Sequence, residues 1–129
     1  MTTLSPPLLE LDFDKLSAVP QGCVPVAVQE AASREVILLA YTNAAAMREA
    51  FARRRLILWS TSRNALWEKG ADSGNTFTLL EAYVNCEQNS LLYVVRQDKD
   101  GICHTRDAAG RHRSTCFYRK IDLDTLRLQ

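Results

Sequence analysis

Nothing in the sequence indicates export or membrane insertion. Residues 1–7 contain no basic region followed by an apolar stretch, and no uninterrupted apolar run reaches the roughly 18 residues that a membrane-spanning helix needs. Charge of one sign is not in excess either, because 16 lysines and arginines balance 15 acidic residues. We therefore expect a cytoplasmic protein with no membrane partner and no extended basic surface for nucleic acid.

Cysteine is sparse, and the cysteines present lack the close paired spacing of a zinc finger. The four are Cys23, Cys86, Cys103 and Cys116. Because no export signal is present, we expect reduced thiols or metal ligands rather than two disulfides. From the number of cysteines alone, each could equally well be a buried structural thiol or a metal ligand.

The apolar pattern predicts an α+β fold with a mainly antiparallel sheet and one principal helix. Two β-branched segments, residues 24–29 and 36–41, flank a polar turn and are typical of a hairpin. The alanine-rich residues 44–53 predict a helix, which Asn43 can cap. We interpret the three arginines at residues 53–55 as cations that suit the C-terminal end of the helix dipole, rather than as a basic patch.

The remaining sequence predicts further strands, two long loops and a short flexible end. Residues 1–12 are expected to form a flexible N-terminus, and residues 13–129 a single domain. Segments 63–75 and 97–114 are longer than ordinary connections, and such loops often carry function. The further strands are expected at residues 56–60, 76–84, 91–97 and 116–121.

Residues 59–75 combine features that suit a bound nucleotide. Arg63 and Lys69 can pair with phosphate, and a tryptophan face can stack on a purine. A hairpin loop whose tryptophans fill the core, with Ser-Gly-Asn as turn chemistry, is an equally good interpretation of the composition. The candidate substrate-binding residues are Trp59, Ser62, Arg63, Trp67, Lys69, Ser73, Gly74 and Asn75.

Three of the cysteines match the number of ligands that a catalytic zinc takes from a protein. Such a zinc keeps its fourth position for water and lowers the pKa of that water to roughly 7, which produces a hydroxide nucleophile. His104 follows Cys103 directly and could act as a general base or move a proton to a leaving nitrogen. If Cys103 is no ligand, a solvated histidine is the better interpretation of His104.

These motifs resemble the signature of the phosphoribosyl-AMP cyclohydrolase family over roughly residues 13–119. Residues 59–75 resemble its long motif Trp-Ser-x-Ser-Arg-x-x-Leu-Trp-x-Lys-Gly-x-x-Ser-Gly-Asn, which is highly specific. Residues 103–105 resemble its Cys-His-Thr motif, and residues 115–119 its closing Ser-Cys-Phe segment. Cys86 falls where the family has Asp-Cys-Asp-x-Asp.

The resemblance implies an intertwined homodimer with zinc sites between its subunits. Cys86 would come from one chain, and Cys103 and Cys116 from the other. It also implies a hydrolase that acts on C–N bonds of cyclic amidines in histidine biosynthesis. In that reaction, metal-activated water attacks C6 of the adenine ring of N1-(5-phosphoribosyl)-AMP, and the N1–C6 bond opens.

Two stretches depart from the family pattern. Asn85, Glu87 and Asn89 stand where the family has the aspartates of a magnesium site, and the loss of two carboxylates should weaken magnesium binding substantially. Residues 106–113 lengthen the loop between Cys103 and Cys116. Its His112 and arginines could reach a substrate phosphate, but we favour the interpretation that they face water.

The departures leave two other functions open. One is hydrolysis of another purine-like or amidine substrate, because the zinc motif survives while the second metal site does not. The other is a zinc-binding paralogue without turnover. The retained nucleotide motif argues against the paralogue, since a pure metal binder has no use for it.

Overall fold

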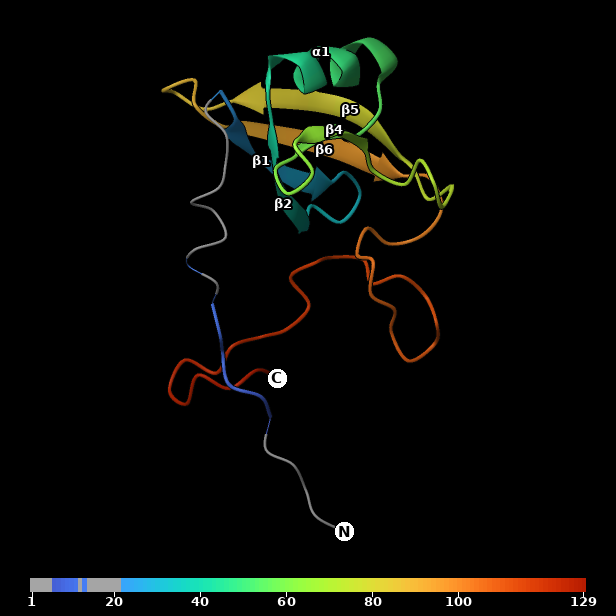
Figure 1. The fold of residues 1–129 in the computed structure, drawn as a ribbon. Coiled ribbons are helices and arrows are strands. Elements are labelled where there is room, and N and C mark those ends of the chain that lie inside the picture. The colour runs from blue at the N-terminus through green and yellow to red at the C-terminus, as the bar shows by residue number, and fades with distance from the viewer. Residues whose placement is uncertain (1–5, 12, 14–21) are drawn as a thin grey trace.

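A single curled sheet of six strands forms the body of the protein (Figure 1). This computed structural model describes residues 6–11, 13 and 22–129; residues 1–5 and 12 of the predicted flexible terminus lie outside the described part. The strand order is β4-β3-β2-β1-β6-β5. The strands are β1 (Val24–Glu30), β2 (Val36–Thr42), β3 (Ile57–Ser60), β4 (Ala65–Glu68), β5 (Phe77–Val84) and β6 (Leu91–Gln97).

The sheet is mixed, although most of its neighbours run antiparallel. The predicted hairpin is confirmed as the antiparallel pair β1–β2, and β2–β3, β3–β4 and β5–β6 are antiparallel as well. Strands β1 and β6 pair in parallel, from Val26 opposite Leu91 to Glu30 opposite Val95. With one helix in the described part, the α+β class is confirmed.

Helix α1 (Ala44–Arg53) begins and ends as its sequence predicts. The Asn43 side chain accepts a hydrogen bond from the Ala46 amide at 2.9 Å, so it caps the first turn. Arg54 ends the helix in the left-handed conformation, with φ of 55°. The helix lies over one face of the sheet (Figure 1). In the described part, no helix is long and apolar enough to cross a membrane.

The core lies between α1 and the covered face of the sheet. Alternate residues of β1 and β6 turn into it, as the two-residue period of a strand requires. The rings of Phe51 on α1 and Tyr93 on β6 have centroids 6.0 Å apart at 58°, a tilted contact. The fully buried residues include Val26, Val28, Ala46, Ala50, Leu56, Ile57, Leu58, Phe77, Tyr93 and Val95.

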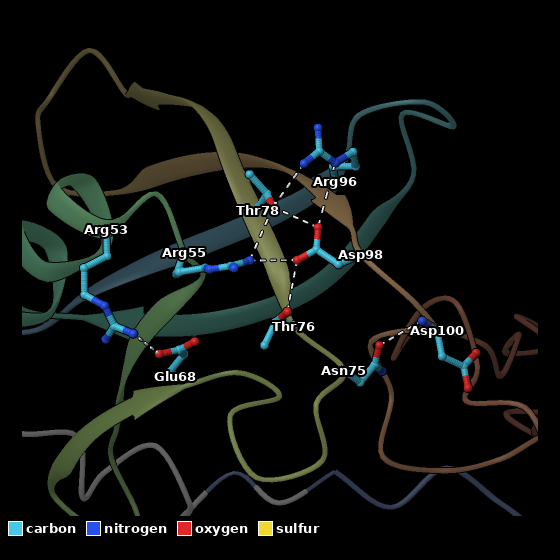
Figure 2. A network of polar contacts seen from close by, with 9 residues as sticks. All are labelled: Arg53, Arg55, Glu68, Asn75, Thr76, Thr78, Arg96, Asp98 and Asp100. Carbon is cyan, nitrogen blue, oxygen red and sulfur yellow. Dashed lines mark hydrogen bonds and ion pairs between the residues drawn. The ribbon is translucent and has the colours of Figure 1, made fainter.

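Two of the three arginines at residues 53–55 are held in ion pairs. Arg53 pairs with Glu68 on β4 at 2.6 Å, and Arg55 pairs with Asp98 after β6 at 2.8 Å (Figure 2). Asp98 also accepts hydrogen bonds from the hydroxyls of Thr76 and Thr78. These contacts fasten the start of the long loop after β6 to the end of the helix.

Two predictions about strands are wrong. Residues 116–121 form no strand, because the segment leaves the sheet after the Cys116 amide bonds the Ile37 carbonyl at 2.9 Å. Figure 1 shows residues 114–129 extending away from the sheet, where the Leu8 and Arg127 backbones pair. Conversely, β4 lies inside the predicted loop 63–75, where it pairs with β3 as the second strand of a hairpin.

Candidate functional site

A cavity of about 220 Å³ lies where the end of β4 meets the loop after β6. It brings together six of the fifteen residues that the sequence singles out, although the two segments that carry them are some thirty positions apart. The predicted residues that line it are Trp67, Lys69, Ser73, Asn75, Cys103 and His104.

The wall formed by residues 69–75 depends on a tight turn at Gly70. Gly70 has φ of +84°, and a Cβ there would lie 1.8 Å from the Asn75 carbonyl oxygen, so no other residue fits. The Gly74 amide closes the turn by donating to the Gly70 carbonyl at 2.9 Å. Gly74 has the structural position of a turn residue and does not line the cavity.

Asn75 joins the two walls of the cavity. Its side-chain amide donates to the Gly101 carbonyl at 2.6 Å. Its side-chain oxygen accepts from the Asp100 amide at 2.8 Å, the contact drawn in Figure 2. Both polar atoms of this predicted substrate-binding side chain are therefore engaged with backbone. The loop that carries Cys103 is held in place by them.

Cys103 and Cys116 form a coupled pair of thiols. Burial, followed by the adjacent charge of Cys103, raises the pKa of Cys116 to about 11. Burial also raises the pKa of Cys103, but hydrogen bonds from Thr105 and Cys116 and the charge of Lys69 outweigh it, so this pKa lies below its ordinary value. The Thr105 hydroxyl is 2.9 Å from the Cys103 sulfur. Of the two thiols, Cys103 is therefore the one that loses its proton more readily.

A thiolate beside a second thiol suits a soft or borderline metal such as zinc. The pair supplies two ligands, and the described residues contain no group of three metal-binding side chains. Cys86 lies in the exposed turn between β5 and β6, whereas Cys103 follows the other end of β6. The seven residues of that strand span roughly 20 Å. One chain therefore fits a zinc incompletely, with two of the three predicted ligands together.

The turn that carries the predicted magnesium ligands is closed upon itself. Asn85 donates to the Asn89 side-chain oxygen at 2.6 Å, and its own oxygen accepts from the amides of Asn89 and Ser90. Glu87 is the one carboxylate among them, and it accepts from Asn89 at 3.4 Å. Magnesium requires oxygen ligands and favours carboxylates, so these residues do not fit it.

The structure separates several predicted residues from this cavity. Trp59 and Ser62 line a second cavity of about 370 Å³ along β2 and β3, with Trp67 between the two cavities. The Trp59 indole nitrogen is buried and has no hydrogen-bond partner within the described residues. Arg63 is exposed on the turn between β3 and β4 and lines neither cavity.

Lys69 and His104 differ in how firmly they are held. The Lys69 ammonium lies 5.5 Å from the centre of the Trp67 ring, a cation–π contact that keeps it at the cavity. His104 is exposed at the cavity lining beside buried Cys103. A cation, an aromatic face and an imidazole thus lie around the Cys103 thiol at one cavity.

The sequence did not identify Asp100, which holds the loop beside the cavity. It accepts the backbone amides of His112 and Gly101, and these two bonds lower the pKa of its carboxyl group. The pair Asp100-Gly101 is a turn signal that could have drawn attention to it.

The interpretation that His112 faces water is wrong, because the residue is half-buried and lines the cavity. Arg106 and Arg111 of the same loop are exposed, as expected. Arg113 lies over the Tyr118 ring, with its guanidinium carbon 4.3 Å from the ring centre.

Comparison with known proteins identifies relatives of this chain. A family model described as phosphoribosyl-AMP cyclohydrolase matches residues 38–118. A phosphoribosyl-AMP cyclohydrolase from Hyphomonas neptunium is 38% identical over 95% of this chain and 92% of the relative. One from Halobacterium salinarum is 44% identical over 92% of this chain and 88% of the relative. The histidine biosynthesis bifunctional protein HisIE of Aquifex aeolicus is 34% identical over 89% of this chain and 51% of the relative.

Proposed function

The chain belongs to the phosphoribosyl-AMP cyclohydrolase family of hydrolases, and on that premise we propose that it hydrolyses the N1–C6 bond of the adenine ring of N1-(5-phosphoribosyl)-AMP. The reaction is a step of histidine biosynthesis. The observation that carries the proposal is the 220 Å³ cavity, which gathers Trp67, Lys69 and the Cys103 thiol. Free thiols suit a reducing compartment, and we assign the protein to the cytoplasm.

Substrate recognition follows from the charges and faces around the cavity. Lys69 binds a phosphate, because its ammonium is held at the cavity by Trp67. Trp67 offers its ring to the purine, and the Ser73 hydroxyl is a donor at the cavity wall. Arg63, exposed on its turn, reaches the second phosphate of the substrate from outside the cavity.

Cys103 and Cys116 hold a zinc ion, and Cys86 from a second copy of the chain completes the ligand set. Bound zinc supplies the activation of water for attack on C6. The lowered pKa of Cys103 supports its role as a ligand, since the thiolate is the form that binds metal. His104 holds and moves the proton that the leaving N1 requires.

A homodimer is part of this proposal. The distance between the Cys86 turn and the Cys103–Cys116 pair supports shared sites, because no described residue of the same chain completes them. The apolar residues of the extended C-terminal segment support the same assembly: Phe117 is 60% exposed and Leu123 is 87% exposed. Side chains of that size left in water are typical of a surface that a partner covers.

Turnover of N1-(5-phosphoribosyl)-AMP by the purified, zinc-loaded protein tests the proposal. We expect the ring-opened product at an ordinary enzymatic rate, without added magnesium, because Asn85 and Asn89 do not supply a magnesium site. If zinc is bound and the substrate is not opened at any magnesium concentration, the assignment is wrong. The amides at these two positions then favour a hydrolase for another purine-like ring.

A further inference from the structure

The loop between Thr105 and Arg113 is a hairpin rather than a loose insertion. The Asp107 amide bonds the Arg111 carbonyl at 2.8 Å, and the backbones of Arg106 and His112 pair antiparallel. A tight turn at residues 107–110 closes it. The hairpin thereby returns His112 and Arg113 to the side of Cys103.

Both peptide groups of Cys103 are held by this returning arm. The Cys103 amide donates to the Arg113 carbonyl at 3.0 Å, and the Cys103 carbonyl lies 2.9 Å from Nδ1 of His112. Because a carbonyl oxygen can only accept, Nδ1 is the donor. Two adjacent residues of the hairpin therefore fix the backbone on either side of the thiol.

His112 is in turn held by the loop network of the cavity. Its amide donates to the Asp100 carboxylate at 3.0 Å, and the Asp100 amide donates to Asn75 at 2.8 Å. Gly101 packs so closely under the arm that a Cβ would lie 2.3 Å from the His112 carbonyl oxygen. The chain of contacts runs from the wall at Asn75 through Asp100 and His112 to Cys103.

We propose that His112 is a positioning residue for Cys103. Its ring N–H fixes the Cys103 carbonyl, and this determines the direction in which the Cys103 side chain enters the cavity. The inference rests on the proposed function in assigning Cys103 to zinc. The hairpin at residues 105–113 thus serves the site instead of lying free in water.

Two substitutions of His112 distinguish the role of Nδ1 from that of Nε2. In His112→Asn the amide nitrogen lies about where Nδ1 lay and can still donate to the Cys103 carbonyl. In His112→Gln the amide reaches the position of Nε2, and the Nδ1 donor is lost. His112→Ala removes both, and Arg111→Ala, at an exposed neighbour, is the matched control.

The measurement is zinc retention against a coloured chelator, with thermal unfolding followed in parallel. We expect His112→Gln and His112→Ala to bind zinc at least about tenfold more weakly, and His112→Asn and Arg111→Ala to match the parent, because residues that orient a metal ligand typically contribute this much. If His112→Asn is as weak as His112→Ala, or if no variant differs from the parent, the inference is overturned.

If the parent binds no zinc, the proposed function is contradicted but the positioning role of His112 is not. A second measurement tests that role without zinc. It is the hydrogen exchange of the Cys103 amide in metal-free protein. Exchange should be faster in His112→Ala and His112→Gln than in the parent, and His112→Asn should restore protection. Equal exchange in all four proteins would overturn the positioning role.

Discussion

The hydroxyl of Thr105 lies 2.9 Å from the sulfur of Cys103, and this contact helps to hold the pKa of Cys103 below its ordinary value, in contrast to that of Cys116. Among the described residues no hydroxyl lies so close to Cys116, and burial raises its pKa to about 11. The asymmetry between the two neighbouring thiols therefore comes from the burial of Cys116 and from the contact of Cys103 with a residue of the Cys-His-Thr motif. The first prediction follows from this contact.

Thr105→Val should raise the pKa of Cys103, whereas Thr105→Ser should leave it near its present value. A hydrogen bond to a charged group contributes about 1.5 to 3 kcal/mol, so alkylation of Cys103 near neutral pH should slow by about tenfold in the valine variant. The measurement is the rate of iodoacetamide labelling of metal-free protein, read at the Cys103 peptide by mass spectrometry. Equal rates in both variants would contradict the role of the hydroxyl.

The stability that Asp98 contributes to the folded protein should be lost in acid. Partial burial raises the pKa of its carboxyl group, but hydrogen bonds from Thr78 and Thr76 and the charge of Arg55 outweigh burial, and the net pKa is lowered. A carboxyl group whose pKa is lower in the folded state stabilises that state above its unfolded pKa of about 3.9, and this stability is lost as the pH falls through the folded pKa.

Asp98→Asn should therefore lower the free energy of unfolding by about 2 kcal/mol at pH 7, and the difference from the parent should shrink below about pH 4. Urea denaturation between pH 3 and pH 7 measures both effects. Asp72→Asn, at an exposed position, is the control and should follow the parent. A difference that does not change with pH would show that Asp98 does not act through its charge.

Lys69→Ala and His104→Ala should separate binding from chemistry in steady-state kinetics. Phosphate pairing by Lys69 acts in the ground state and the transition state alike, so its loss should raise KM on the order of tenfold. Proton transfer by His104 acts in the transition state, so its loss should lower kcat by about 100-fold or more. If His104→Ala changed only KM, His104 would not be the acid or base.

Because the turn at residues 85–90 is closed by its own side chains, the activity of the enzyme should not depend on magnesium. The double change Asn85→Asp and Asn89→Asp removes the bond between the two side chains and provides two carboxylates, so calorimetry should detect magnesium binding to this variant and none to the parent. The variant should also gain activity as magnesium is added. A parent that already binds magnesium at this turn would contradict the argument from charge.

The sequence predicted the local elements well, because their signals lie within one segment. The cap at Asn43 and the β1–β2 hairpin are set by neighbouring residues, and the structure has both. The parallel pairing of β1 with β6 depends on contacts some sixty positions apart, and residues 116–121 read as a strand although they have no strand to pair with. Such non-local choices leave little trace in sequence periodicity.

The sequence predicted which residues meet at the candidate site better than it predicted what each of them does there. Lys69, Trp67 and Cys103 do meet at one cavity. Asn75, expected on the substrate, is engaged with the backbone of the opposite loop. His112 could not be identified because it returns to the cavity only through the pairing of the hairpin, which the loop composition does not reveal.

The most direct test of shared zinc sites in a cyclohydrolase dimer is complementation between two inactive variants, Cys86→Ser and Cys103→Ser. Each homodimer lacks a ligand at both sites, but a mixed dimer has one complete site, formed by Cys86 of one chain with Cys103 and Cys116 of the other. An equal mixture, refolded together, should therefore recover about a quarter of the parent activity on N1-(5-phosphoribosyl)-AMP, as random pairing into two-fold dimers requires. Mixed dimers that form, as native mass spectrometry can establish, and yet remain inactive would contradict the account.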